Sequence, residues 1–232
     1  GSLIGIAAGQ SFGSFKDKTG IGADYDVDSF LAMIYGRMHP FRDSKFTLDG
    51  YGAYGRSRFK GDSYMMGSAN GRADTDTFSG GLYGTWTERF ALGKAFVTPY
   101  TGIEFMTSEL KGFSESGPYG RTFGHARAQN WTIPVGITIA RAYQTDGGTT
   151  ITPALTVAVA QDVSRMNPKS NVAGPLGTWN ARGVNVGRTA FRLNAGIDVL
   201  FSNQWGARVC YQFETRNKLT AHGINGALSY TF

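Results

Sequence analysis

The sequence predicts an all-β protein: a closed, antiparallel transmembrane β-barrel of about ten strands, forming a single domain over residues 1–232. Three observations predict it. Apolar and polar residues alternate along much of the chain, long and short connections follow one another in turn, and no apolar run reaches the roughly 18 residues of a membrane-spanning helix. Because only helices and edge-free sheets pair every backbone group inside lipid, a barrel is the spanning fold that remains.

Composition supports a chain without a thick soluble core. Hydrophobic residues make up 41% of the sequence, glycine occurs 33 times and aromatic residues reach 13%. The usual hydrophobic share of a globular protein is about 45 to 50%. The net charge of +6 comes from scattered Lys and Arg residues, which we interpret as charges of rims and loops and not as a nucleic-acid surface.

Motifs for metals and cofactors are not found in the sequence. Cys210 is the single cysteine, so it forms no intrachain disulfide and belongs to no cluster of soft ligands. The histidines and acids are scattered, and glycine pairs such as Gly50-Tyr51-Gly52 precede no helix that could cradle a phosphate. We therefore expect no metal and no cofactor.

The clearest strands lie near the C-terminus. In residues 191–201 six apolar side chains alternate with mostly polar ones, and the pattern restarts at Trp205 after a tight turn at 202–204. This period of two is that of a strand, since a helix repeats every three or four residues. Residues 131–139 and 151–159 alternate bulky side chains with Gly, Ala, Thr and Pro, as in a barrel wall with a crowded or open interior.

Ten strands are expected along the chain, and their connections alternate in length. The strands cover residues 2–12, 26–38, 45–59, 73–88, 95–109, 128–142, 149–162, 188–202, 204–215 and 219–232. Long connections follow the first, third, fifth and seventh strands, as at 59–72, 111–127 and 163–187, and short ones lie at 39–44, 89–94, 143–148 and 202–204.

Outer-membrane barrels have short periplasmic turns and long outer loops. The even strand number then places both chain ends in the periplasm and every long loop outside the cell. A soluble Greek-key sandwich shares the alternation of faces but has no reason to order its loops long, short, long, short. Aromatic girdles are expected at the two membrane interfaces, formed by Tyr35, Tyr54, Trp86, Trp131, Phe201 and Trp205.

The last eight residues resemble the C-terminal signal of outer-membrane barrels. Asn225, Ala227, Tyr230 and Phe232 match its polar, small, aromatic and terminal positions, although the family usually has Gly where Ala227 stands. The resemblance implies that the barrel assembly machinery pairs with this strand by strand addition.

Nearly the whole chain resembles the translocator domain of autotransporters, the type V secretion proteins of Gram-negative bacteria. The similar segments are 48–52 (LDGYG), 78–84 (FSGGLYG), 99–105 (PYTGIEF) and 192–213. The resemblance implies a barrel that is inserted among the lipid and lipopolysaccharide of the outer membrane. There it helps an N-terminal passenger reach the cell surface and then anchors it.

Family members have a passenger, a helix inside the pore and twelve strands, whereas this chain starts in what would be the third strand. The helix and the first two strands are therefore missing, supplied elsewhere, or never existed. The lumen would hold the passenger or its linker helix. Polar residues expected to face this lumen are Tyr100, Glu104, Arg192, Asn194, Asp198, Arg208, Gln212 and Glu214, either with a holding role or as generic lumen residues.

Two alternatives stay open. A stand-alone ten-stranded porin or surface-binding barrel would work through its long outer loops. An outer-membrane protease would need a histidine positioned beside carboxylates, and His125 and His222 are expected near the outer rim, with His39 at a periplasmic turn. Because no spacing fixes a histidine beside an acid, we assign no catalytic residue and expect no enzyme.

Overall fold

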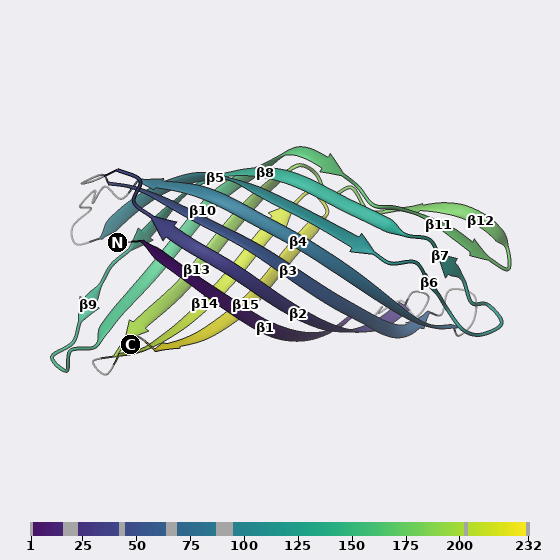
Figure 1. Cartoon of the computed structure of the whole chain (residues 1–232), viewed down its shortest axis with the longest axis horizontal. Coiled ribbons are helices and arrows are strands. Elements are labelled where there is room, and N and C mark those ends of the chain that lie inside the picture. Colours follow the sequence, from purple (N-terminus) through teal and green to yellow (C-terminus); the bar gives the residue numbers. More distant parts are fainter. Residues whose placement is uncertain are drawn as a thin grey trace.

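Ten long strands form one antiparallel sheet that curls into a barrel wall (Figure 1). The computed structural model describes residues 2–15, 23–41, 45–63, 69–86, 95–201 and 204–230. Each long strand pairs with the next in the order β1 (Leu3–Phe15), β2 (Ala23–Met38), β3 (Phe46–Ser63), β4 (Ala69–Trp86), β5 (Phe96–Leu110), β8 (Ala126–Ala140), β10 (Thr150–Met166), β13 (Thr189–Leu200), β14 (Trp205–Arg216) and β15 (Leu219–Tyr230). All ten strands expected from the sequence are confirmed.

One long-range ion pair identifies the inner face of the wall. Glu104 of β5 and Arg192 of β13 approach to 2.8 Å, although β8 and β10 lie between their strands. Three strand spacings amount to about 14 Å along the sheet, so the two side chains can meet only on the concave side. Directly paired residues of an antiparallel ladder share a face, and the register therefore assigns every strand position to the lumen or to the outside.

The outer face is a belt of large apolar side chains. Val135, Ile137, Val159, Ile197 and Val209 all lie on this face and are between 43% and 59% exposed. The inner face of β8 and β10 carries small residues, so the two faces separate as the alternation of the sequence predicts. A lipid bilayer is the environment in which such an exposed apolar belt is stable.

A second, four-stranded sheet extends beyond one end of the barrel. It consists of β6 (Phe113–Ser114), β7 (Thr122–Phe123), β11 (Lys169–Gly174) and β12 (Gly177–Arg182). A short strand at the other end, β9 (Tyr143–Gln144), pairs with the start of β10.

Three long connections differ from their expected form. The expectation of loops at 111–127 and 163–187 was wrong, because these segments contain β6, β7, β11 and β12 and the end of β10. The connection expected at 59–72 is also shorter, since β3 and β4 pair as far as Ser63 and Ala69. Polar residues that lie beyond the membrane can continue a strand ladder in water. Because they lack the alternation of apolar and polar residues, the sequence pattern predicts them as loops.

Both chain ends lie at the end of the barrel opposite to β11 and β12 (Figure 1). This agrees with the even number of strands. Among the described pairings, β1 bonds only to β2 and β15 only to β14, so each keeps one edge without a strand partner. The described part of the chain contains no helix that is long and apolar enough to cross a membrane.

Candidate functional site

A chain of alternating charges lines the lumen. The Arg192 guanidinium donates to both carboxylate oxygens of Glu104, at 2.8 and 2.9 Å, and its Nε donates to Glu214 at 2.8 Å. The Tyr83 hydroxyl donates to Glu104 at 2.9 Å. One arginine thus joins β5 to β13 and β14 across the bore.

The chain of charges continues from Glu214 to deeply buried partners. Arg216 donates to Glu214 at 2.6 Å and to Asp162 at 2.7 Å. The Asp162 side chain is 1% exposed, and it also accepts a hydrogen bond from Thr132 at 2.8 Å and has Arg165 at 3.7 Å. We call Glu104, Arg192, Glu214, Arg216, Asp162 and Arg165 the lumen network.

The charges of the lumen network balance, with three acids and three arginines. A buried carboxylate without a cationic partner would be strongly unfavourable, so each member depends on its neighbours. The arrangement can tie four strands together and present a polar surface without net charge to the bore. It shows no nucleophile activated by an adjacent base.

The eight polar residues expected in the lumen all lie on the inner face by register. Glu104, Arg192 and Glu214 belong to the lumen network. Asp198 and Arg208 form a separate, exposed pair at 3.4 Å, and Asn194 lies directly opposite Gln212. Tyr100 packs its ring edge on Tyr83, with the ring centroids 6.4 Å apart.

Three charged members of the lumen network were not anticipated from the sequence. Asp162 continues the alternating face of Thr152 to Ala160, and Arg216 continues that of Arg208 to Glu214, so periodicity alone could have identified both. Arg165 lies beyond a bulge between Asp162 and Ser164, which shifts the alternation by one residue. For this residue the sequence carries no signal.

Tyrosines from neighbouring strands cover the inner wall. Tyr51 and Tyr83 stack with their ring centroids 6.2 Å apart, and a Cβ added at Gly81 would lie 2.5 Å from the Tyr51 ring. A Cβ at Gly102 would lie 2.6 Å from Tyr83. Each ring therefore occupies the space above a glycine of the adjacent strand.

The prediction that Tyr35 belongs to an aromatic girdle at a membrane interface was wrong. Tyr35 lies directly opposite Tyr51 in the β2–β3 ladder and covers Gly5 of β1, so it faces the lumen. The sequence misleads here because both faces of β2 are apolar. Only the register with β3 shows which face turns inward.

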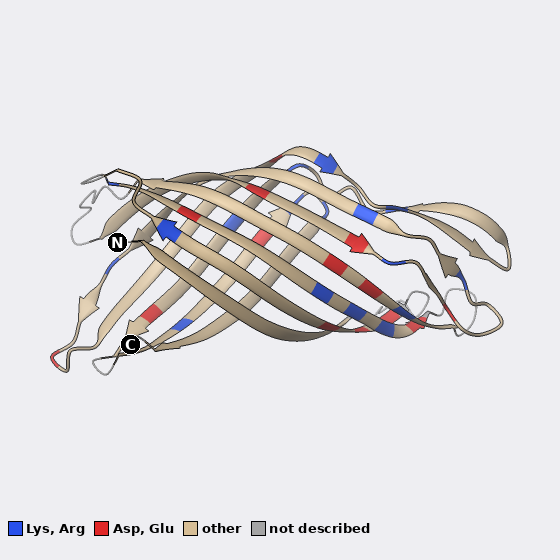
Figure 2. Ribbon diagram, viewed as in Figure 1, with Lys and Arg blue, Asp and Glu red and all other residues tan. Residues whose placement is uncertain are grey.

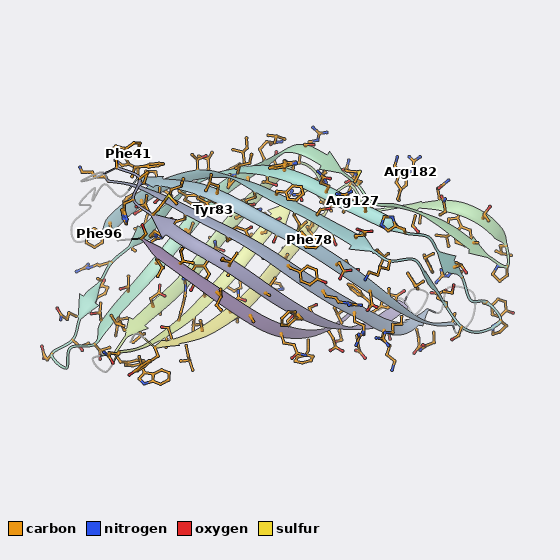
Figure 3. The ribbon with its side chains drawn as sticks, viewed as in Figure 1. Phe41, Phe78, Tyr83, Phe96, Arg127 and Arg182 are labelled. Carbon is orange, nitrogen blue, oxygen red and sulfur yellow. The ribbon has the colours of Figure 1, made fainter. Side chains whose placement is uncertain are left out.

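Four other expected girdle residues lie on the outer face by register, at both ends of the belt: Tyr54, Trp86, Trp131 and Trp205. Tyr54 packs on Phe78 with ring centroids 4.9 Å apart, and Trp131 packs on Phe105 at 4.7 Å; Phe78 is labelled in Figure 3. Near the chain ends, Trp205 packs on Tyr230 at 5.1 Å. Trp86 ends β4 at this same end, and Phe201 directly follows the last residue of β13.

Two other groups of expected residues can be placed only in part. Asn225, Ala227 and Tyr230 lie on β15, whereas Phe232 lies outside the described residues. His125 contacts Glu109 at 2.6 Å, and both side chains are exposed. Within the described ranges, no group of three or more His, Cys, Asp or Glu residues could hold a metal.

Comparison with known proteins identifies relatives of both the sequence and the fold. The family model "Autotransporter beta-domain" matches residues 1–212. The chain is 25% identical to the probable outer membrane protein pmp21 of Chlamydia pneumoniae over 138 residues, covering 59% of this chain and 8% of that protein. It is 26% identical to pmp13 of the same organism over 207 residues, covering 84% and 21%. The chain thus spans less than a quarter of these curated relatives.

The fold is that of a solved translocator. The translocator domain of the autotransporter NalP from Neisseria meningitidis superimposes with a TM-score of 0.78 over 100% of this chain and 76% of that chain, at 16% identity. The all-β barrel fold is therefore confirmed. The family match over residues 1–212 confirms the resemblance seen in the sequence, and the chain belongs to the autotransporter β-domain family.

Proposed function

We propose that this barrel sits in the bacterial outer membrane, helps an N-terminal passenger of the same protein reach the cell surface, and then anchors it. The observation that carries the proposal is a lumen lined by small residues and a balanced charge network inside an apolar outer belt. Such a lumen suits the passage of a polypeptide, and its described residues place no nucleophile beside a general base. We accordingly infer that the barrel is not an enzyme.

The difference between the two ends of the barrel supports an orientation in the membrane. The end that carries β6, β7, β11 and β12 faces the outside, and the end where β1 begins and β15 finishes faces the periplasm. Outer-membrane barrels have this asymmetry of long and short connections. The passenger would then leave through the end that carries the second sheet.

Two further strands from the N-terminal side of the same protein would complete the wall between β15 and β1. The available edges of these two strands support this, because an open edge in lipid leaves backbone groups unpaired. The passenger's linker helix would lie in the lumen, beside the lumen network. The lipid partners would be the phospholipids and lipopolysaccharide around the belt.

Insertion would use the last strand. Asn225, Ala227, Tyr230 and Phe232 would be read by the barrel assembly machinery, which pairs with the available edge of β15 by strand addition. All twelve residues of β15 are exposed, as expected of a strand presented to a partner.

Surface display of a reporter tests the function. A folded reporter domain placed in the passenger position of the full-length protein should be labelled by antibody on intact cells. The same reporter on a protein without residues 1–232 should stay unlabelled until the cells are opened. Equal labelling of the two proteins on intact cells would contradict a translocator role. Ion conductance across planar bilayers without any exported reporter would instead favour the stand-alone porin.

A further inference from the structure

A groove runs along the lipid-facing side of the first five strands. It has a volume of about 730 Å³, and small outward residues, Ala8, Ala32, Gly52 and Gly80, form its floor. Larger side chains of the same face, including Ile34, Tyr54 and Phe78, form its sides. The groove is apolar and faces the membrane, so it can accept an acyl chain.

Charged pairs cross from β3 to β4 immediately beyond this groove. The Tyr54–Phe78 pair marks its upper edge; Arg56 then faces Asp76 at 3.9 Å, and Arg58 faces Asp74 at 3.4 Å. Figure 2 shows blue bands on β3 beside red bands on β4, in the half away from the chain ends. Each of these two arginines therefore has an acid on the neighbouring strand.

The next pair is different, because Lys60 lies directly opposite Arg72. Both side chains are exposed on the outer face. Asp26 lies opposite Lys60 on the other side, and Asp62 and Asp74 flank the pair on the same face. Asp62 accepts a hydrogen bond from Asn70 and Asp74 pairs with Arg58, and within the described residues no ion pair is found for Lys60 or Arg72. Like charges directly opposite each other destabilise a ladder, and an anion bound between them would remove the repulsion.

The height of this pair indicates the kind of anion. Lys60 is six positions beyond Tyr54, about 20 Å along the strand and about 15 Å along the membrane normal for a strand tilted near 40°. The headgroup layer of an ordinary bilayer adds only about 5 to 8 Å beyond the hydrocarbon. A lipid whose phosphates sit on sugars farther from the acyl chains fits better than a phospholipid.

We propose that the outer wall of β2, β3 and β4 binds one phosphorylated lipopolysaccharide molecule. An acyl chain fills the groove at Gly52 and Gly80, and a sugar phosphate lies between Lys60 and Arg72. The guanidinium and ammonium groups supply charge-assisted hydrogen bonds to the phosphate oxygens. This inference rests on the proposed orientation, in which this end of the barrel opens into the outer leaflet.

The chain contains a matched control. Lys169 of β11 lies directly opposite Arg182 of β12, so the same two charges face each other in the second sheet. Arg182, labelled in Figure 3, lies beyond the barrel, and no residue of β11 or β12 lines the groove. Removing these charges changes the net charge equally without touching the proposed lipid site.

Native mass spectrometry of the detergent-extracted full-length protein tests the inference. It measures the binding of rough lipopolysaccharide, either intact or with its phosphates removed. The double variant Lys60→Gln, Arg72→Gln should bind the intact lipid about tenfold more weakly and lose the preference for phosphate. Gly52→Leu should weaken both forms, because nothing but Ile34 lies within 4 Å of a Cβ at this position and the new side chain fills the groove. Lys169→Gln, Arg182→Gln should bind as the unaltered protein does.

The inference is wrong if the Lys60→Gln, Arg72→Gln variant binds the intact lipid with the original affinity. It is also wrong if this variant loses no more affinity than the Lys169→Gln, Arg182→Gln control. Heat-shifted migration of every variant shows that the barrel is folded. Surface display of the reporter should be unaltered in the double variant. A protein that binds the lipid but displays no reporter would contradict the proposed function alone, so the two failures are distinguishable.

Discussion

Four tyrosines of the lumen each cover a glycine of a neighbouring strand, and this fit fixes the packing of the inner wall. The pairs are Tyr35 with Gly5, Tyr51 with Gly81, Tyr83 with Gly102 and Tyr100 with Gly136. A Cβ at these glycines would overlap the ring or adjacent backbone. Protein interiors tolerate such overpacking poorly, so the glycines are needed for reasons of space.

Gly5→Ala is expected to destabilise the barrel by about 1 to 3 kcal/mol, because the three atoms nearest to the added Cβ all belong to the Tyr35 side chain. Urea unfolding in lipid vesicles measures the change. Tyr35→Ala should remove most of the penalty of Gly5→Ala. Gly9→Ala, on the same strand and face, has nothing within 4 Å and serves as the control. A penalty at Gly9 equal to that at Gly5 would refute the packing argument.

Arg192→Gln should destabilise the barrel more than the double variant Glu104→Gln, Arg192→Gln. The single change leaves Glu104 and Glu214 without their shared partner, at a cost of about 1 to 3 kcal/mol for side chains that are 18% and 28% exposed. Arg208→Gln, in an exposed pair with Asp198, should cost less than about 1 kcal/mol. Equal losses in the three proteins would show that the network is not coupled.

For single residues, the sequence predicts which side of the barrel wall a side chain faces, but not which side chain it bonds to. The alternation of β13 and β14 places Arg192 and Glu214 on the lumen side, as the register shows. The bond between Glu104 and Arg192 joins residues 88 positions apart, and it depends on how far the sheet curls. No local pattern encodes that distance.

Among the elements, one well-buried ion pair closes the connection between β6 and β7 in the second sheet. Arg121 donates to both carboxylate oxygens of Glu115, at 2.7 and 2.8 Å, and the Glu115 side chain is 2% exposed. These hydrogen bonds raise the pKa of Arg121 above its ordinary value. Backbone bonds between Asn70 and Ser116 fasten the same segment to β4.

Glu115→Gln should loosen β6 and β7 while the barrel stays folded, because a buried arginine loses its charged partner. Hydrogen exchange followed by mass spectrometry should show faster exchange at 113–123 and unaltered exchange in β5 and β8. Glu109→Gln, whose side chain is 54% exposed, is the matched control and should leave both regions unaltered. Faster exchange throughout the barrel would contradict a local role.

The elements of the barrel are more predictable than those of the second sheet. Strands such as β8 and β13 carry long alternations, because lipid and lumen select opposite residue types on the two faces. β11 and β12 are six residues each and lie outside the membrane, where no such selection acts. Their pairing is set by the turn between Gly174 and Gly177, and the alternation of apolar and polar residues gives no sign of this turn.

For the whole molecule, two aromatic girdles bound an apolar belt of membrane thickness. On β4 the outer residues Phe78 and Trp86 are eight positions apart, which corresponds to about 27 Å along the strand and about 21 Å along the membrane normal. Outer-membrane barrels have an apolar band about 25 Å tall. The closeness of the two values supports insertion with β4 tilted across the membrane.

Electrophoresis of the full-length protein, extracted from the outer membrane and run unheated and heated, tests the central claim most directly. The account predicts a band that shifts on heating and that carries, by mass spectrometry, a large N-terminal extension or the scar of its removal. A band that does not shift would contradict a membrane barrel, and a shifting band that begins near Gly1 in the native gene product would contradict a translocator.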